Sequence, residues 1–140
     1  MIKLDTEKIQ YIGLFESLTN ASVKDCILDR EKNRITFVVK ENHAGRAIGK
    51  RGSNVKNLEK ILNKKIEIIE FSEDPVRFAA FLLRPSIVKE GFISERSDSK
   101  KILNIVLSKK VDLDRNKINK AKKLIQRYFD IDDLVVSWVN

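Results

Sequence analysis

Three of the five glycines lie within the eleven residues Gly45–Val55, and their spacing is suited to binding an anion. Gly49 and Gly52 enclose two cations, Lys50 and Arg51, in a Gly-x-x-Gly loop. Glycine lets a backbone approach a ligand closely because no Cβ intervenes. An amphipathic helical pattern follows, and the N-terminus of a helix has unpaired N–H groups that favour an anion. The segment therefore predicts a clamp for a nucleic-acid backbone.

Ten residues around this loop form the predicted binding site. The glycines allow close approach, the two enclosed cations contact phosphate, and the helix starting at Ser53 presents its N–H groups. Ile48 and Val55, with Val38 of a nearby strand, form an apolar floor under the bases. The complete set is Arg46, Ile48, Gly49, Lys50, Arg51, Gly52, Ser53, Asn54, Val55 and Lys56.

The charge distribution agrees with a polyanionic partner. The 140 residues include 28 Lys and Arg against 20 Asp and Glu, which gives a net charge of +8. Residues 42–65 hold seven cations and a single acid, Glu59. Most of the excess charge can therefore be assigned to the segment around the loop, which indicates nucleic acid.

Other chemistry fits the same residues less well. An ordinary helix connection also uses glycine as a left-handed cap. A P-loop needs one more residue in the spacing and a hydroxyl where Arg51 stands. His43 is the only histidine, so no His-paired metal site is expected; it serves as a helix cap or surface residue, or bonds a nucleotide. We expect no enzyme, cofactor, metal site or small-molecule substrate.

Hydrophobic periodicity predicts an α+β protein built from a degenerate tandem repeat. Asp74 and Pro75 suit the N-cap and first position of a helix, and they place a boundary between residues 1–73 and 74–140. Each part is expected to hold a three-stranded sheet covered by helices, the second part having one helix fewer. The expected helices are 8–19, 43–48, 53–62, 75–84 and 114–128, and the strands are 23–29, 34–40, 65–71, 86–93, 101–107 and 134–139.

Two compositional features indicate a cytoplasmic protein. Cys26 is the only cysteine and lies in a strand-like run, so it is expected to be a buried, unreactive thiol in a reducing compartment. No segment approaches the ~18 apolar residues that cross a bilayer, and the charged segment Met1–Glu7 is unlike a signal peptide. No membrane partner is expected.

Most aromatic residues occupy apolar positions of the predicted elements. Such residues belong to a core, whereas readers that stack bases on a sheet need exposed aromatics. Trp138, close to the C-terminus, is open to two interpretations: packing between the two parts, or a contact surface. The expected core aromatics are Phe15, Phe37, Phe71, Phe78 and Phe81.

Several runs resemble the first KH domain of archaeal NusA-like transcription factors. They are Gly45–Val55, Leu58-Glu59, Lys65–Phe71 and Asp74-Pro75, together with the late run 127–136. The resemblance covers almost the whole chain. It implies two KH domains of the prokaryotic (type II) topology, single-stranded RNA as partner, and a role in transcription elongation or termination. Whether RNA polymerase is contacted stays open.

The second part departs from this family, because its matching region 109–119 has no glycine. We therefore expect one clamp only. The second part, with ten cations and two acids in residues 100–127, is expected to guide an RNA backbone electrostatically or to brace the first part. Two alternatives stay open: a ribosome-associated KH protein, and a KH-fold module that binds a peptide.

Overall fold

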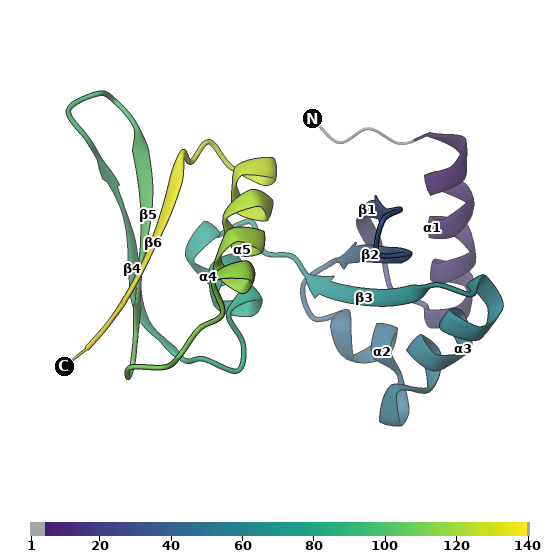
Figure 1. Ribbon diagram of the computed structural model, residues 1–140. Helices are drawn as coiled ribbons and strands as arrows, with labels where there is room; N and C mark the ends of the chain where they lie inside the picture. The colour runs from purple at the N-terminus through teal and green to yellow at the C-terminus, as the bar shows by residue number, and fades with distance from the viewer. Residues whose placement is uncertain (1–4, 140) are drawn as a thin grey trace. The chain divides into compact units, whose positions relative to one another are not determined.

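The structure is a computed structural model that describes residues 5–139. The chain divides into two compact units, Ile2–Phe71 and Ser72–Asn140. Each unit contains one three-stranded sheet with helices packed against it (Figure 1). The predicted α+β class is therefore confirmed, with two KH-type units of the expected topology. The helices and strands lie close to their predicted bounds; β4 differs most, starting two residues later than expected at Val88.

The first unit has the order helix–strand–strand–helix–helix–strand. Strands β1 and β2 are antiparallel, whereas β2 and β3 are parallel. A short 3₁₀ turn, Lys50–Gly52, joins α2 to α3. The elements are α1 (Thr6–Thr19), β1 (Val23–Asp29), β2 (Arg34–Val39), α2 (Ala44–Ile48), α3 (Ser53–Leu62) and β3 (Lys65–Glu70).

The core of the first unit lies between the sheet and its helices. Phe37 of β2 is fully buried and stacks on Phe15 of α1, with 4.1 Å between the ring centroids. Ala47 of α2 and Leu58 of α3 are also fully buried in this cluster. Both helices that flank Lys50–Gly52 are therefore anchored in the core by an apolar residue.

The second unit repeats this topology with one helix fewer. Strands β4 and β5 are antiparallel, and β5 and β6 are parallel. Asp74 caps α4 by accepting a 3.0 Å hydrogen bond from the N–H of Val76, as predicted, and Asp114 caps α5 in the same way. The elements are α4 (Pro75–Leu82), β4 (Val88–Glu95), β5 (Lys101–Leu107), α5 (Arg115–Tyr128) and β6 (Asp133–Trp138).

Burial confirms most of the predicted core. Cys26 is fully buried, and so are Phe15, Phe37 and Phe78, while Phe71 is nearly so. Trp138 is 43% exposed, with the Nζ of Lys110 5.5 Å from its ring centroid. Over residues 5–139, no helix is both long enough and apolar enough to span a membrane.

Candidate nucleic-acid interface

The glycine loop, Gly49–Gly52, is a tight turn with left-handed backbone at three of its four residues. The φ angles are 79° at Gly49, 56° at Arg51 and 73° at Gly52. The N–H of Gly52 donates to the carbonyl of Gly49 over 3.1 Å, and the N–H of Ser53 donates to the carbonyl of Lys50. Left-handed residues in such turns make concave backbone surfaces that bind anions.

The space beside Gly52 is open. A Cβ built at this position would come within 4.0 Å of one atom only, the Cε of Lys56. That atom is close to the end of a flexible side chain and can move away. A ligand can therefore reach the backbone of Gly52 directly, and Lys56 is already beside it.

The first turn of α3 adds to the attraction for an anion. Gly52 is the N-cap of this helix, and no side chain bonds to the helix N-terminus. The N–H of Ser53 donates to the carbonyl of Lys50 inside the glycine loop, so it is not among the N–H groups that the helix can present to a ligand. The positive end of the α3 dipole remains directed toward the loop.

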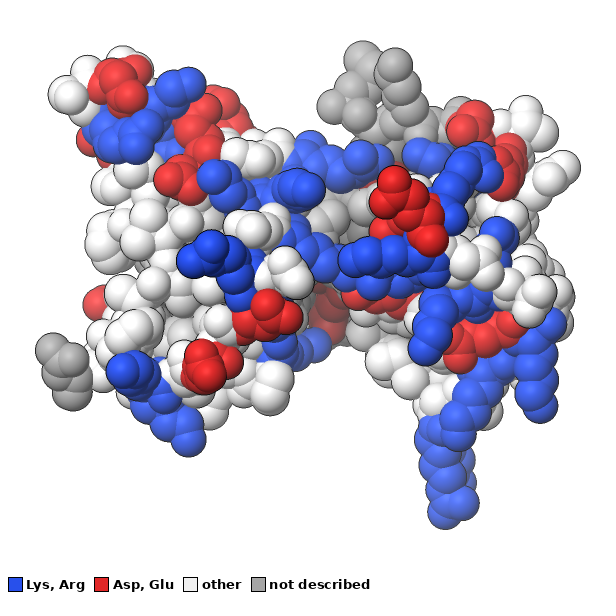
Figure 2. Space-filling model, in the orientation of Figure 1, with Lys and Arg blue, Asp and Glu red and all other residues white. Residues whose placement is uncertain are grey.

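The cations of the loop are not neutralised by the protein. Lys50, Arg51 and Lys56 are exposed, and across residues 5–139 none of the three takes part in an ion pair. The carboxylate of Glu59, the single acid of residues 42–65, accepts a 3.2 Å hydrogen bond from the N–H of Ile66 instead. In Figure 2, Lys and Arg side chains project into solvent from the end of the first unit where α2 joins α3.

The apolar floor is smaller than predicted. Ile48 is 41% exposed and Val55 is partly buried against the core, so both fit the expected role. Val38 is fully buried, so its side chain is unavailable to a base. The prediction for Val38 was wrong because alternation along a strand shows which residues share a face without showing whether that face is covered.

Arg46 and Asn54 make contacts inside the protein. The guanidinium of Arg46 donates to the carbonyl of Asn20, the C-cap residue of α1, over 3.4 Å. The side-chain amide of Asn54 donates to the carbonyl of Arg46 over 2.9 Å. Asn54 was predicted to lie at the RNA-binding site. Its amide nitrogen donates to a carbonyl of α2, so this donor is used within the protein.

His43 has a structural role that the sequence pattern did not reveal. Its Nδ1 accepts a 2.9 Å hydrogen bond from the N–H of Ser22, 21 residues earlier in the chain. Partial burial and the positive charges of Arg46 and Lys40 lower the pKa of His43, which keeps the ring neutral and Nδ1 able to accept. In the sequence, the only sign of this contact was that His43 lies directly before the helix α2.

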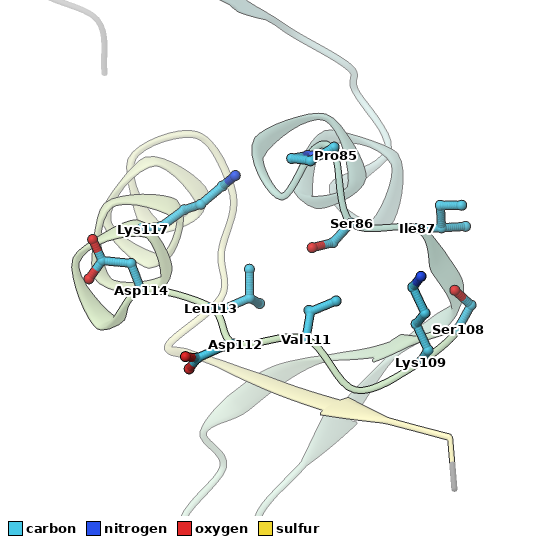
Figure 3. Close-up of a pocket in the computed structure, with 10 residues that line it drawn as sticks. All are labelled: Pro85, Ser86, Ile87, Ser108, Lys109, Val111, Asp112, Leu113, Asp114 and Lys117. Atoms are coloured by element: carbon cyan, nitrogen blue, oxygen red, sulfur yellow. The ribbon is translucent and has the colours of Figure 1, made fainter.

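The second unit has a shallow groove where the first unit has its glycine loop. The cavity, about 560 Å³, is bordered by the connection 108–114 between β5 and α5 (Figure 3). Val111 and Leu113 point into it, whereas the carboxylates of Asp112 and Asp114 point away. Asp114 caps α5 and Lys117 donates to the carbonyl of Arg84, so these polar groups serve the fold.

Carboxylates neutralise part of the basic character of the second unit. Of the ten cations in residues 100–127, three form ion pairs with aspartates that follow α5 in the sequence. The pairs are Lys100–Asp132 at 4.0 Å, Lys101–Asp130 at 3.2 Å and Lys122–Asp133 at 3.1 Å. Among residues 5–139, no group of histidine, cysteine and carboxylate side chains is arranged to hold a metal ion.

The chain is similar in sequence and in fold to known proteins. Residues 9–79 match the KH domain family. "Probable transcription termination protein NusA" of Halobacterium salinarum is 33% identical over 136 residues, which cover 95% of this chain and 96% of the relative. Relatives with the same name in Methanocaldococcus jannaschii and Methanococcus vannielii are 44% and 46% identical. Those two alignments cover 60% and 67% of this chain, but only 45% and 53% of the relatives' own lengths.

A solved structure has the same fold over 95% of the chain. The crystal structure of the protein APE1850 superposes with a TM-score of 0.79 at 30% sequence identity, and covers 95% of this chain and 99% of its own. The fold and the glycine loop define a KH-type protein. The chain belongs to the KH-domain family and, within it, to the NusA-like proteins known from archaea. The resemblance carried by Gly45–Val55 is thereby confirmed.

Proposed function

We propose that this protein binds unpaired RNA at the glycine loop and acts without catalysis as a NusA-type transcription factor. The observation that carries the proposal is the open backbone at Gly52 beside the unpaired cations Lys50 and Arg51. KH domains use such a loop to hold the backbone of about four nucleotides.

Each residue has a distinct part in this mechanism. A phosphate lies against the backbone of Gly52, in reach of Lys50 and Arg51 and at the positive end of α3. Ile48 and Val55 contact the bases, since they are the partly exposed apolar side chains on either side of the loop. Phosphate contacts supply most of the affinity and little sequence preference, so we expect moderate discrimination among single-stranded RNAs.

Fluorescence anisotropy with short single-stranded RNAs tests the site. The double variant Lys50→Asp, Arg51→Asp is expected to lose binding while it remains folded. Lys32→Asp, Lys89→Asp is the matched control, because both lysines are exposed and the change in net charge is the same. Equal losses in the two double variants would contradict a site at the loop and would indicate a response to net charge only.

Salt dependence tests whether phosphate contacts dominate. The logarithm of the affinity should fall linearly with the logarithm of the salt concentration, with a slope of about −0.7 for each phosphate neutralised. Three cations at the loop predict a slope near −2, and Lys50→Asp, Arg51→Asp should flatten it. A flat response in the unmodified protein would exclude binding through phosphates.

The transcription role is supported by the relatives, which carry the name of a probable transcription termination protein. In a reconstituted archaeal-type transcription assay, the protein should change the fraction of terminated or paused transcripts, and Lys50→Asp, Arg51→Asp should not. Co-sedimentation with ribosomal subunits and no effect on transcripts would favour a ribosomal role instead. Turnover of ATP or GTP would contradict a non-enzymatic protein.

A further inference from the structure

The side chain of Asn54 connects the two helices that flank the glycine loop. Its amide nitrogen, in the first turn of α3, donates to the carbonyl of Arg46 in α2 over 2.9 Å. That carbonyl belongs to the end of a helix, where the last four carbonyls have no partner within the helix. The hydrogen bond therefore closes the base of the glycine loop from one helix to the other.

Asn54 also fills the space beside Gly49. A Cβ built on Gly49 would lie 2.8 Å from the Cγ of Asn54 and 2.9 Å from both its Nδ2 and its backbone nitrogen. Real Cβ atoms do not approach other atoms so closely. The backbone of Gly49, with φ 79° and ψ 169°, lies in a region that glycine almost exclusively adopts. Gly49 is thus required by its conformation and by the close approach of Asn54.

The second glycine of the loop has the opposite surroundings. Gly52 has φ 73° and ψ 19°, a left-handed conformation that asparagine also tolerates, and the space beside it is open. One glycine is therefore packed from within the protein and the other faces solvent. A ligand that approaches the loop meets Gly52, while the side chain of Asn54 occupies the space at Gly49.

We propose that Asn54 is a positioning residue that holds the glycine loop in its RNA-binding shape, and that RNA approaches the loop on the side of Gly52. This inference rests on the proposed function. Without the bond to Arg46, the ends of α2 and α3 are free to separate and the loop samples other conformations. Each of these has to be reordered when RNA binds, which weakens binding without removing any RNA contact.

Asn54→Ala tests the role of the side chain, with Asn57→Ala as the matched control. Asn57 lies on the same helix and is exposed. We expect Asn54→Ala to lower the affinity for single-stranded RNA about tenfold and Asn57→Ala to change it less than about twofold. In the RNA-free protein, the amide NMR signals of Gly49 and Gly52 should shift or broaden in Asn54→Ala and not in Asn57→Ala.

A second variant separates positioning from general loss of folding. Asn54→Asp keeps the size of the side chain and places a carboxylate where a helix N-terminus favours it, but an ionised carboxylate cannot donate to the carbonyl of Arg46. Its thermal unfolding should resemble that of the unmodified protein, while the loop signals shift as in Asn54→Ala. Unchanged loop signals in both variants would overturn the proposal, whatever happens to RNA affinity.

The two glycines give an independent test of the direction of approach. Gly49→Ala should lower the melting temperature, because the new Cβ meets Asn54. Gly52→Asn should melt like the unmodified protein and bind RNA at least about tenfold more weakly, since its side chain enters the open space. Normal RNA binding by folded Gly52→Asn would overturn the proposed side of approach. An unmodified protein that binds no RNA would instead contradict the proposed function, and the loop signals of Asn54→Ala would still decide the positioning role.

Discussion

The two units have the same strand order and pairing, yet of the two connections between second strand and long helix only that of the first unit contains a Gly-x-x-Gly loop. Between the second strand and the following long helix, the first unit has residues 40–52, which include α2 and the glycine loop. At the same place the second unit has the shorter connection 108–114, without a glycine. The sheet and helices are therefore a support common to both units, and the connection between β-strand and helix decides which unit contains the proposed clamp.

The two units also differ in whether their Lys and Arg side chains form ion pairs. In the first unit Lys50, Arg51 and Lys56 are exposed and take part in no ion pair within residues 5–139. In the second unit, three lysines are paired with Asp130, Asp132 and Asp133. A count of cations along the chain makes the second unit look as basic as the first. The gathering of three unpaired cations at one loop distinguishes the first unit, and it predicts the stronger RNA contact there.

The largest effect is expected from the core that supports the glycine loop. Phe37→Ala removes a fully buried ring that stacks on Phe15, and should lower the free energy of unfolding by about 3–5 kcal/mol. Phe92→Ala in the second unit is the matched control, because that ring is 52% exposed and should cost under about 0.5 kcal/mol. Chemical denaturation measures both, and similar values would contradict the burial described for Phe37.

Gly52→Asp should have the next largest effect. The new carboxylate repels phosphate and enters the open space beside the loop, so RNA affinity should fall at least about tenfold. Gly13→Asp introduces the same charge on the exposed surface of α1, where nothing lies within 4 Å of a new Cβ. Anisotropy should show nearly normal binding for Gly13→Asp. A folded Gly52→Asp protein with normal RNA affinity would show that the loop is not the site.

A charge reversal in the second unit should have a smaller effect. Lys109→Asp, Lys110→Asp changes the net charge as much as Lys50→Asp, Arg51→Asp does, and both lysines are exposed in the connection 108–114. Because this unit has no clamp, RNA there responds to screened charge only, and affinity should fall about twofold to threefold. A loss as large as that of the first-unit variant would mean that the second unit holds the RNA backbone directly.

Near neutral pH, the smallest effect concerns Cys26 of β1. Burial raises its pKa from 9.0 to about 11, so the thiol stays protonated and unreactive near neutral pH. Iodoacetamide at pH 8 should modify the unfolded chain and leave the folded protein almost unmodified. Because the pKa is higher in the folded state, the stability linked to this thiol is intact below pH 9 and falls as the pH rises from 9 to 11. Cys26→Ala should remove this part of the pH dependence.

Local sequence predicted much of the fold, including the loop that contains Gly49 and Gly52. The alternation of Ile35, Phe37 and Val39 identified a strand, and Asp74-Pro75 identified the start of a helix, because each depends on neighbouring residues. The spacing of Gly49 and Gly52 likewise predicted a loop between two helices, and both glycines adopt positive φ angles there. These features follow from sterics and hydrogen bonds within a few residues.

Only the tertiary structure decided which of those residues are available to a ligand. Val38 and Ile48 are both apolar residues near the loop, yet Val38 is fully buried and Ile48 is 41% exposed. The bond from Asn54 to Arg46 depends on the angle between two helices, and the pair of Lys101 with Asp130 joins residues 29 positions apart. Periodicity and spacing determine the elements and their apolar faces. Burial, pairing and free charge depend on which surfaces meet when the chain folds, and that is decided by contacts between segments distant in sequence.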